Sequence, residues 1–140
     1  AREIGITGPF VGGNAAINDE FVKIAGVDIA KGCYMTNEPL PGDLPYAEAK
    51  EFLAAYKDKF GEIPSSPWPI YAADALNVIA YAVDKTKSTD SKVLASYLRD
   101  SVNGVPGITG PIGFTAQGDR EGVPFYLYTV DDQGKIVVSK

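Results

Sequence analysis

The sequence predicts an α/β fold that forms part of a larger domain. Of its 140 residues, 45% are hydrophobic and 22% are charged, which is the composition of a folded soluble chain. Its 15 glycines and 10 prolines gather in clusters that divide the chain into short segments. Between the clusters, segments with helical spacing of apolar residues alternate with short β-favouring runs. A complete α/β domain would contain more parallel strands than this pattern supplies.

The first part of the chain is predicted to form a strand, a helix and a second strand. Residues 9–11 are an apolar run that ends at two glycines, which is typical of a buried strand before a tight turn. Asn18 is placed to cap a short helix that carries Phe21 and ends at Gly26. Residues 33–36 are apolar and too few for a helix, so they are predicted to form the second strand.

Three long helices are predicted, over residues 47–60, 69–86 and 91–102. Apolar residues recur at helical spacing in the first, which should end at Gly61. The second is rich in alanine, which favours close packing on a sheet. Its predicted apolar stripe consists of Leu76, Ile79, Ala80 and Val83. A run of cap-forming residues that includes Asp90 precedes the third helix.

Beyond Gly104 the apolar pattern changes from helical spacing to alternation, which predicts strands. One strand is expected over residues 112–115. Two more are expected over 125–130 and 136–138, and the Asp-Asp-Gln-Gly segment between them favours a turn. The chain should therefore end in a β-hairpin.

The composition argues against most catalytic and metal-binding chemistries. The chain has no histidine, which removes histidine-dependent catalysis and the usual zinc ligand sets. Its one cysteine, Cys33, can form neither an internal disulfide nor a thiolate metal site. We therefore expect no catalytic residue, metal or cofactor; an enzyme would need an Asp, Glu, Lys or Tyr mechanism. With 13 basic and 18 acidic residues and no Lys/Arg cluster, the chain is not expected to bind nucleic acid.

Several segments resemble type I periplasmic solute-binding proteins, among them the branched-chain amino-acid (Leu/Ile/Val) binding proteins of ABC transporters. The motifs include Pro-Phe-Val-Gly-Gly near the start, Tyr-Ala-Ala-Asp-Ala-Leu in the alanine-rich helix and Gly-Asp-Arg before the hairpin. In chain order the similar segments are 1–6, 9–13, 19–26, 31–32, 71–76, 110–114, 118–120 and 125–138. The resemblance covers essentially the whole chain and keeps the order of the family.

The resemblance implies two doubly wound α/β lobes, joined by three hinge crossings, with the ligand in the cleft between them. Family members are more than twice as long as this chain, which is therefore expected to be a C-terminal fragment of the fold. On this pattern, residues 1–37 and 125–140 belong to the C-terminal lobe. Residues 38–124 belong to the N-terminal lobe.

The implied function is that of an extracytoplasmic solute-binding component of an ABC importer. Its lobes would close on a small polar ligand, an amino acid or a related carboxylate or amide, and deliver it to a membrane permease. A periplasmic or extracellular location is implied, with a lipid anchor if the source is Gram-positive. The full-length protein is expected to be a monomer, whereas the chain alone should self-associate through unpaired strand edges and an uncovered helix face. An alternative is a ligand-sensing or regulatory domain of the same fold.

Three residues are candidates for ligand binding: Asn14, Ser66 and Trp68. Asn14 follows the first predicted strand, and ligands of open α/β lobes bind at the carboxyl ends of strands. In the amino-acid-binding members, the resemblance places there a Glu or Asp that binds the ligand's ammonium. Trp68 lies close to the place of a family aromatic that packs on the ligand, and an ungapped match puts Ser66 at that place. Alternatively, Asn14 is a turn or capping residue and Trp68 packs on its neighbours.

Overall fold

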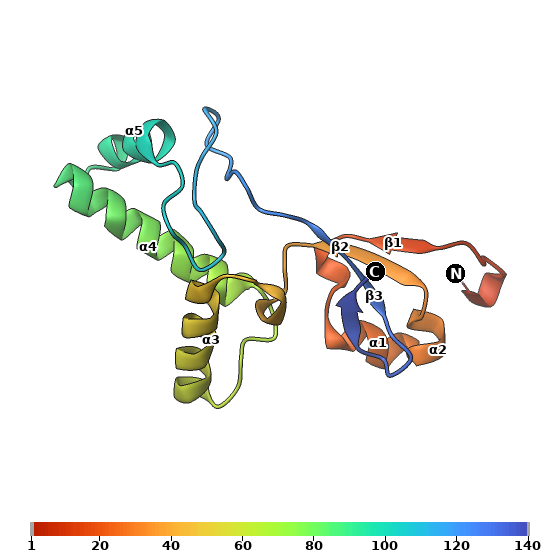
Figure 1. Cartoon of the computed structure of the whole chain (residues 1–140). Helices are drawn as coiled ribbons and strands as arrows, with labels where there is room; N and C mark the ends of the chain where they lie inside the picture. Colours follow the sequence, from red (N-terminus) through yellow and green to blue (C-terminus); the bar gives the residue numbers. More distant parts are fainter. Residues whose placement is uncertain (1, 140) are drawn as a thin grey trace. The chain divides into compact units, whose positions relative to one another are not determined.

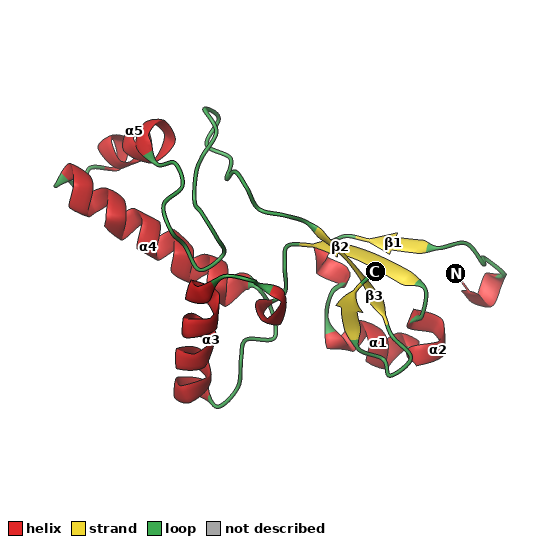
Figure 2. Ribbon diagram, in the orientation of Figure 1, coloured by secondary structure: helices red, strands yellow, loops and turns green. Residues whose placement is uncertain are grey.

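The computed structural model describes residues 2–139, apart from the side chain of Asp19. The chain forms two compact units (Figure 1). The first unit consists of Ala1–Pro39 and Pro124–Lys140, and the second unit of Leu40–Val123. Within the described residues, the strands lie in the first unit and the three longest helices in the second (Figure 2). This mixed structure confirms the predicted α/β class.

A four-stranded sheet forms the centre of the first unit. Its strands, in order across the sheet, are β1 (Phe10–Gly12), β2 (Cys33–Asn37), β3 (Tyr126–Val130) and β4 (Ile136–Val138). β1 is parallel to β2, whereas the other two pairs are antiparallel. The helices α1 (Asp19–Ala25) and α2 (Val27–Ala30) connect β1 to β2 and lie on one side of the sheet (Figure 1). The predicted C-terminal hairpin is confirmed by the β3–β4 pair.

The core of the first unit lies on the face of the sheet that α1 and α2 cover. Met35 of β2 and Tyr128 of β3 are directly opposite each other, and both are buried. On the other face, Val11, Leu127 and Val137 are exposed, because no described helix of this unit covers them. The unit therefore has one packed face and one open apolar face.

Short-range interactions define the ends of these elements. The Asn18 side chain accepts a hydrogen bond from the backbone N–H of Phe21 at 2.9 Å, as expected for the cap of α1. In the hairpin turn, Asp131 Oδ1 accepts bonds from the backbone N–H groups of Gln133 and Lys135. Gly134, with φ +77°, supplies the left-handed backbone conformation that this turn needs.

The second unit is built from the helices α3 (Ala47–Phe60), α4 (Trp68–Thr86) and α5 (Ser91–Ser101). The predicted helices are confirmed within one residue at each end. Gly61 ends α3 in the left-handed conformation, and the Asp90 carboxylate caps α5 by accepting bonds from Lys92 N and Val93 N. The two buried clusters of this unit consist of Leu44, Ala49, Ile70 and Ile108, and of Val78, Val102 and Ile112.

The strand predicted over residues 112–115 is wrong. Ile112 and Phe114 form only isolated bridges, to Val105 and to Arg120. The segment does not join a sheet because residues close to it in sequence provide its partners, and the chain bends at Gly110, where φ is +98°. The alternating apolar pattern here belongs to a partly buried loop.

Candidate functional site

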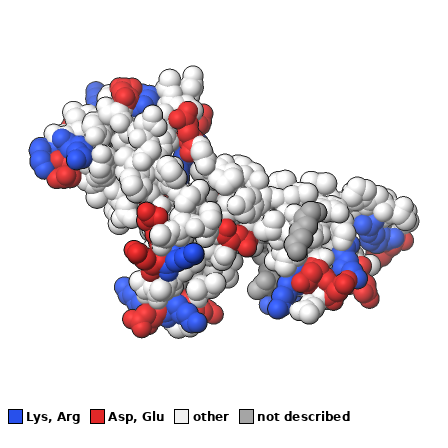
Figure 3. Space-filling model, viewed as in Figure 1, with Lys and Arg blue, Asp and Glu red and all other residues white. Residues whose placement is uncertain are grey.

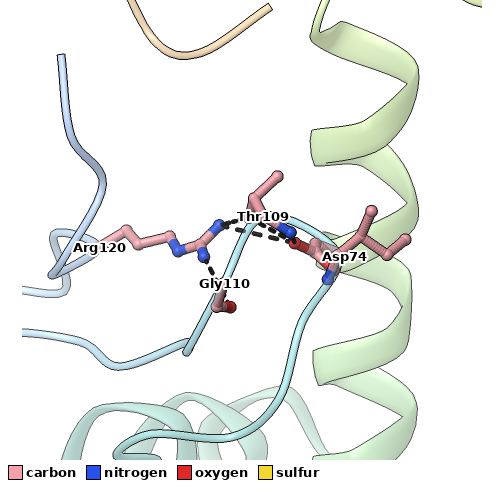
Figure 4. Close-up of polar contacts among 5 residues, drawn as sticks. Asp74, Thr109, Gly110 and Arg120 are labelled. Carbon is pink, nitrogen blue, oxygen red and sulfur yellow. Dashed lines mark hydrogen bonds and ion pairs between the residues drawn. The ribbon is translucent and has the colours of Figure 1, made fainter. Parts of the chain in front are cut away.

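The buried carboxylate of Asp74 holds residues 108–109, in the loop that follows α5, against α4. Asp74 lies one helical turn from Ile70 and from Val78, and it is only 2% exposed. Its Oδ1 accepts a hydrogen bond from Ile108 N at 2.7 Å. Its Oδ2 accepts one from Thr109 N at 2.8 Å and another from the Thr109 hydroxyl (Figure 4). These bonds stabilise a charge that would otherwise be costly to bury.

Arg120 extends this arrangement, and we call Asp74, Thr109 and Arg120 the Asp74 network. Arg120 Nη1 donates to Thr109 Oγ1 at 2.6 Å and lies 3.8 Å from Asp74 Oδ2. Its Nη2 donates to the carbonyl of Gly110 at 3.4 Å. The guanidinium also lies 5.9 Å from the centre of the Tyr71 ring, within cation–π range. Because its oxygens are occupied by these donors, Asp74 is placed to fix a conformation rather than to transfer a proton.

A cavity of about 340 Å³ adjoins the network inside the second unit. It is lined by Tyr71, Asp74, Ala75, Val78, Ile79, Leu98, Ile112, Phe114 and Arg120. Most of these side chains are apolar. Ala75 and Ile79 are on the exposed side of α4, so the cavity continues into that surface. Asn14, Ser66 and Trp68 do not line it.

The three residues predicted to bind ligand belong to two different units. Asn14 is exposed and begins a single 3₁₀ turn, Asn14–Ala16, directly after β1. It is the first residue of this turn, whose N-cap is Gly13, so it is not the capping residue there. Trp68 is the first residue of α4 and is 56% exposed, and Ser66 is half-buried two residues before it. Their roles in ligand binding stay predictions.

The Asp74 network was not predicted from the sequence, although Asp74 and Arg120 both lie in the motifs that carry the family resemblance. One feature of the sequence, the position of Asp74 on α4, indicated that this residue is buried. Asp74 shares the four-residue spacing of Ile70, Val78 and Ala82, the residues that α4 buries. A charged residue on the buried stripe of a helix needs hydrogen-bond partners, which here come from a loop more than 30 residues away.

Comparison with known proteins identifies the class to which this fold belongs. A family model described as periplasmic binding protein matches residues 1–135. The chain therefore belongs to the periplasmic binding protein family, as the resemblance predicted.

Solved structures of such proteins share its fold. The leucine-binding protein LivK of Thermotoga maritima is 26% identical, with a TM-score of 0.83 over 100% of this chain and 39% of its own. The branched-chain amino-acid transporter substrate-binding protein LivJ of Streptococcus pneumoniae, crystallised with isoleucine, is 28% identical. Its TM-score is 0.69 over 99% of this chain and 40% of its own. The chain thus spans about two fifths of the length of these relatives.

The comparisons also bear on the remaining expectations. The family and these structural relatives are solute-binding proteins and not enzymes, in agreement with the sequence-based prediction. No curated protein sequence matches the chain.

Among residues 2–139, no helix has both the length and the apolar character needed to cross a membrane. The same residues contain no group of three or more His, Cys, Asp or Glu side chains that could hold a metal ion.

Proposed function

We propose that the chain is part of the solute-binding component of an ABC importer. The observation that carries this proposal is its superposition, over its whole length, on a leucine-binding protein with a TM-score of 0.83. On this proposal the first unit belongs to the C-terminal lobe of the two-lobed fold, and the second unit to the N-terminal lobe. Closure of the lobes on a ligand precedes its delivery to a membrane permease.

Membership of the periplasmic binding protein family implies an extracytoplasmic location. We propose that this location is the periplasm, or the outer cell surface with a lipid anchor in a Gram-positive source. A permease of the same importer would be the membrane partner.

The proposed ligand is a small polar molecule, an amino acid or a related carboxylate or amide. The names of two relatives support this class, since one binds leucine and the other was crystallised with isoleucine. Asn14 is the residue of this chain that we propose to discriminate among such ligands. Its neutral amide would hold an ammonium group less strongly than a Glu or Asp at that place, because only a carboxylate adds attraction between opposite charges. Trp68 and Ser66 are proposed as further contacts.

A two-lobed chimera tests the function. Residues 1–140 would replace the corresponding part of the Thermotoga maritima leucine-binding protein. In a thermal-shift screen against amino acids, aromatic acids and small amides, at least one compound should raise the Tm with increasing concentration. The proposal would be contradicted by a chimera that unfolds cooperatively but is stabilised by none of these compounds, while the parent protein responds to leucine.

The role of Asn14 can be tested in the same chimera. Asn14→Asp should shift the ratio of affinities towards ligands with a free ammonium by roughly tenfold, equivalent to about 1.4 kcal/mol. Gln133→Glu, an equal charge change at an exposed position of the hairpin turn, is the matched control and should leave the ratio unchanged. If the two variants show the same ratio, Asn14 is a turn residue only.

The surface of α4 supports a further part of the proposal, that the chain alone self-associates whereas the two-lobed protein is monomeric. The predicted apolar stripe of α4 is exposed: Leu76 is 68% exposed and Ile79 is 45% exposed. The exposed charges of the helix, Asp84 and Lys85, lie near its end, and the surface drawn over its middle is uncharged (Figure 3). Such uncovered apolar surface favours association in water.

A further inference from the structure

Residues 121–123, which directly follow Arg120 and end the second unit, form the exit segment through which the chain leaves that unit. We propose that Asp74, acting through Thr109 and Arg120, positions this exit segment by attaching it to α4. The consequence for ligand binding rests on the proposed function: if the two units are the two lobes, the exit segment is a hinge crossing. The Asp74 network would then define where the movable part of that crossing begins.

The loop that precedes the exit is paired mainly with itself. Thr115 N donates to Asp119 O at 2.8 Å, and Glu121 N donates to Gly113 O at 3.0 Å. Gly118, with φ +94°, allows the tight turn between these bonds. These backbone hydrogen bonds therefore define the conformation of the loop, but they do not attach the loop to a helix.

Side chains provide that attachment. The Nη atoms of Arg120 bond to Thr109 and to the Gly110 carbonyl, and Thr109 is in turn bonded to Asp74 by its backbone and its hydroxyl. Thr109 is 2% exposed, so water competes little for these bonds. The result is a continuous series of bonds from α4 to the residue immediately before Glu121.

The guanidinium is oriented by its two Nη atoms. Arg120 Nε is buried and has no hydrogen-bond partner within the described residues. A lysine at this position would keep the charge but could not span Thr109 Oγ1 and Gly110 O with one planar group. The arrangement thus depends on the forked geometry of arginine and not on charge alone.

Amide hydrogen exchange of the 140-residue chain tests the proposal, because it reports local opening at single residues. The reporters are the amides of Ile108 and Thr109, which bond to Asp74, and the amide of Glu121, which bonds to Gly113. In Arg120→Met the Glu121 amide should exchange at least tenfold faster, whereas the other two should change less than threefold. In Thr109→Val the Glu121 amide should also accelerate, and Thr109→Ser, which restores the hydroxyl, should rescue it.

Arg99→Met is the matched control, since Arg99 is a more exposed arginine of α5, and it should leave all three amides unchanged. If Arg120→Met does not fold, Arg120→Lys is used, with a smaller acceleration expected at Glu121. A Glu121 amide that exchanges at the original rate in the folded Arg120 variant would overturn the proposal. So would equal acceleration at Glu121 and in α3, because this would indicate a general loss of stability. Neither outcome depends on whether a ligand binds.

Discussion

Replacement of Asp74 by alanine is expected to lower the free energy of unfolding of the second unit by about 3–5 kcal/mol, the usual cost of removing one partner of a buried ion pair. The change removes the acceptor of three hydrogen bonds from Ile108 and Thr109, and it leaves the largely buried Arg120 without its carboxylate. Each bond to a charged group contributes about 1.5–3 kcal/mol, although water that enters the vacated space recovers part of this.

Asp74→Asn should have a smaller effect, about 2–3 kcal/mol, because the amide keeps the shape and one acceptor. Its NH₂ group would, however, face a donor, either the backbone N–H of Ile108 or that of Thr109.

The assay is urea unfolding followed by circular dichroism at 222 nm, which reports mainly the second unit because α3, α4 and α5 contain most of the helical residues. Asp100→Ala is the control. Its carboxylate is 67% exposed and lies 3.7 Å from Arg99 Nε, so its removal should cost less than about 0.5 kcal/mol. If Asp74→Ala and Asp100→Ala differ by less than about 1 kcal/mol, Asp74 does not organise this unit.

Three further predictions use other parts of the chain. Gly110→Ala should lower the stability by about 1–3 kcal/mol in urea unfolding, because φ is +98° there and a Cβ would lie 2.5 Å from Tyr46 Cζ; an unchanged midpoint would refute this. The hydrogen bond from Lys31 lowers the pKa of Asp132, so stability from this pair should be lost as the pH falls through that lowered pKa. In an NMR titration Lys31→Met should raise the pKa of Asp132 towards its ordinary value, and an unchanged pKa would argue against the pair. Leu76→Lys should shift the chain towards monomer in sedimentation velocity, whereas a chain that is already monomeric would contradict self-association through α4.

The helices could be predicted from the sequence because their ends are determined locally. Asn18, Gly61 and Asp90 each cap or end a helix through interactions with residues at most four positions away. The hairpin was predictable for the same reason, since Gly134 and the Asp131 side chain define its turn. In these cases the information lies within the element itself.

The loop before the hairpin could not be predicted in this way. Residues 112–115 alternate like a strand, but Ile112 and Phe114 form only isolated bridges. The preceding residues 108 and 109 are held by Asp74, which is more than 30 positions away in the sequence. The sequence pattern also did not show which side of α4 is buried in this chain. The side with Ile70, Asp74 and Val78 is packed, while the stripe with the more obvious apolar pattern is exposed. A periodic pattern identifies an apolar face but not what covers it.

The role of Asn14 as a ligand contact could be predicted only in part from the local sequence. Asn14 could be proposed from its position after a strand, and its exposure is compatible with that proposal. On the proposed function, its contact with a ligand would also require the rest of the two-lobed fold, since the chain spans about two fifths of the length of its relatives. Local sequence patterns do not carry that information.

Titration calorimetry with amino acids and with related carboxylates and amides tests the central claim most directly. The 140-residue chain should give no binding heat on its own, because part of the proposed site would have to come from the rest of the two-lobed fold. The chimera with the Thermotoga maritima leucine-binding protein should bind at least one ligand of the proposed class with one-to-one stoichiometry, and Asn14→Asp should alter its selectivity. Tight binding of an amino acid by the 140-residue chain alone would contradict the account, because it would place the whole site within these residues.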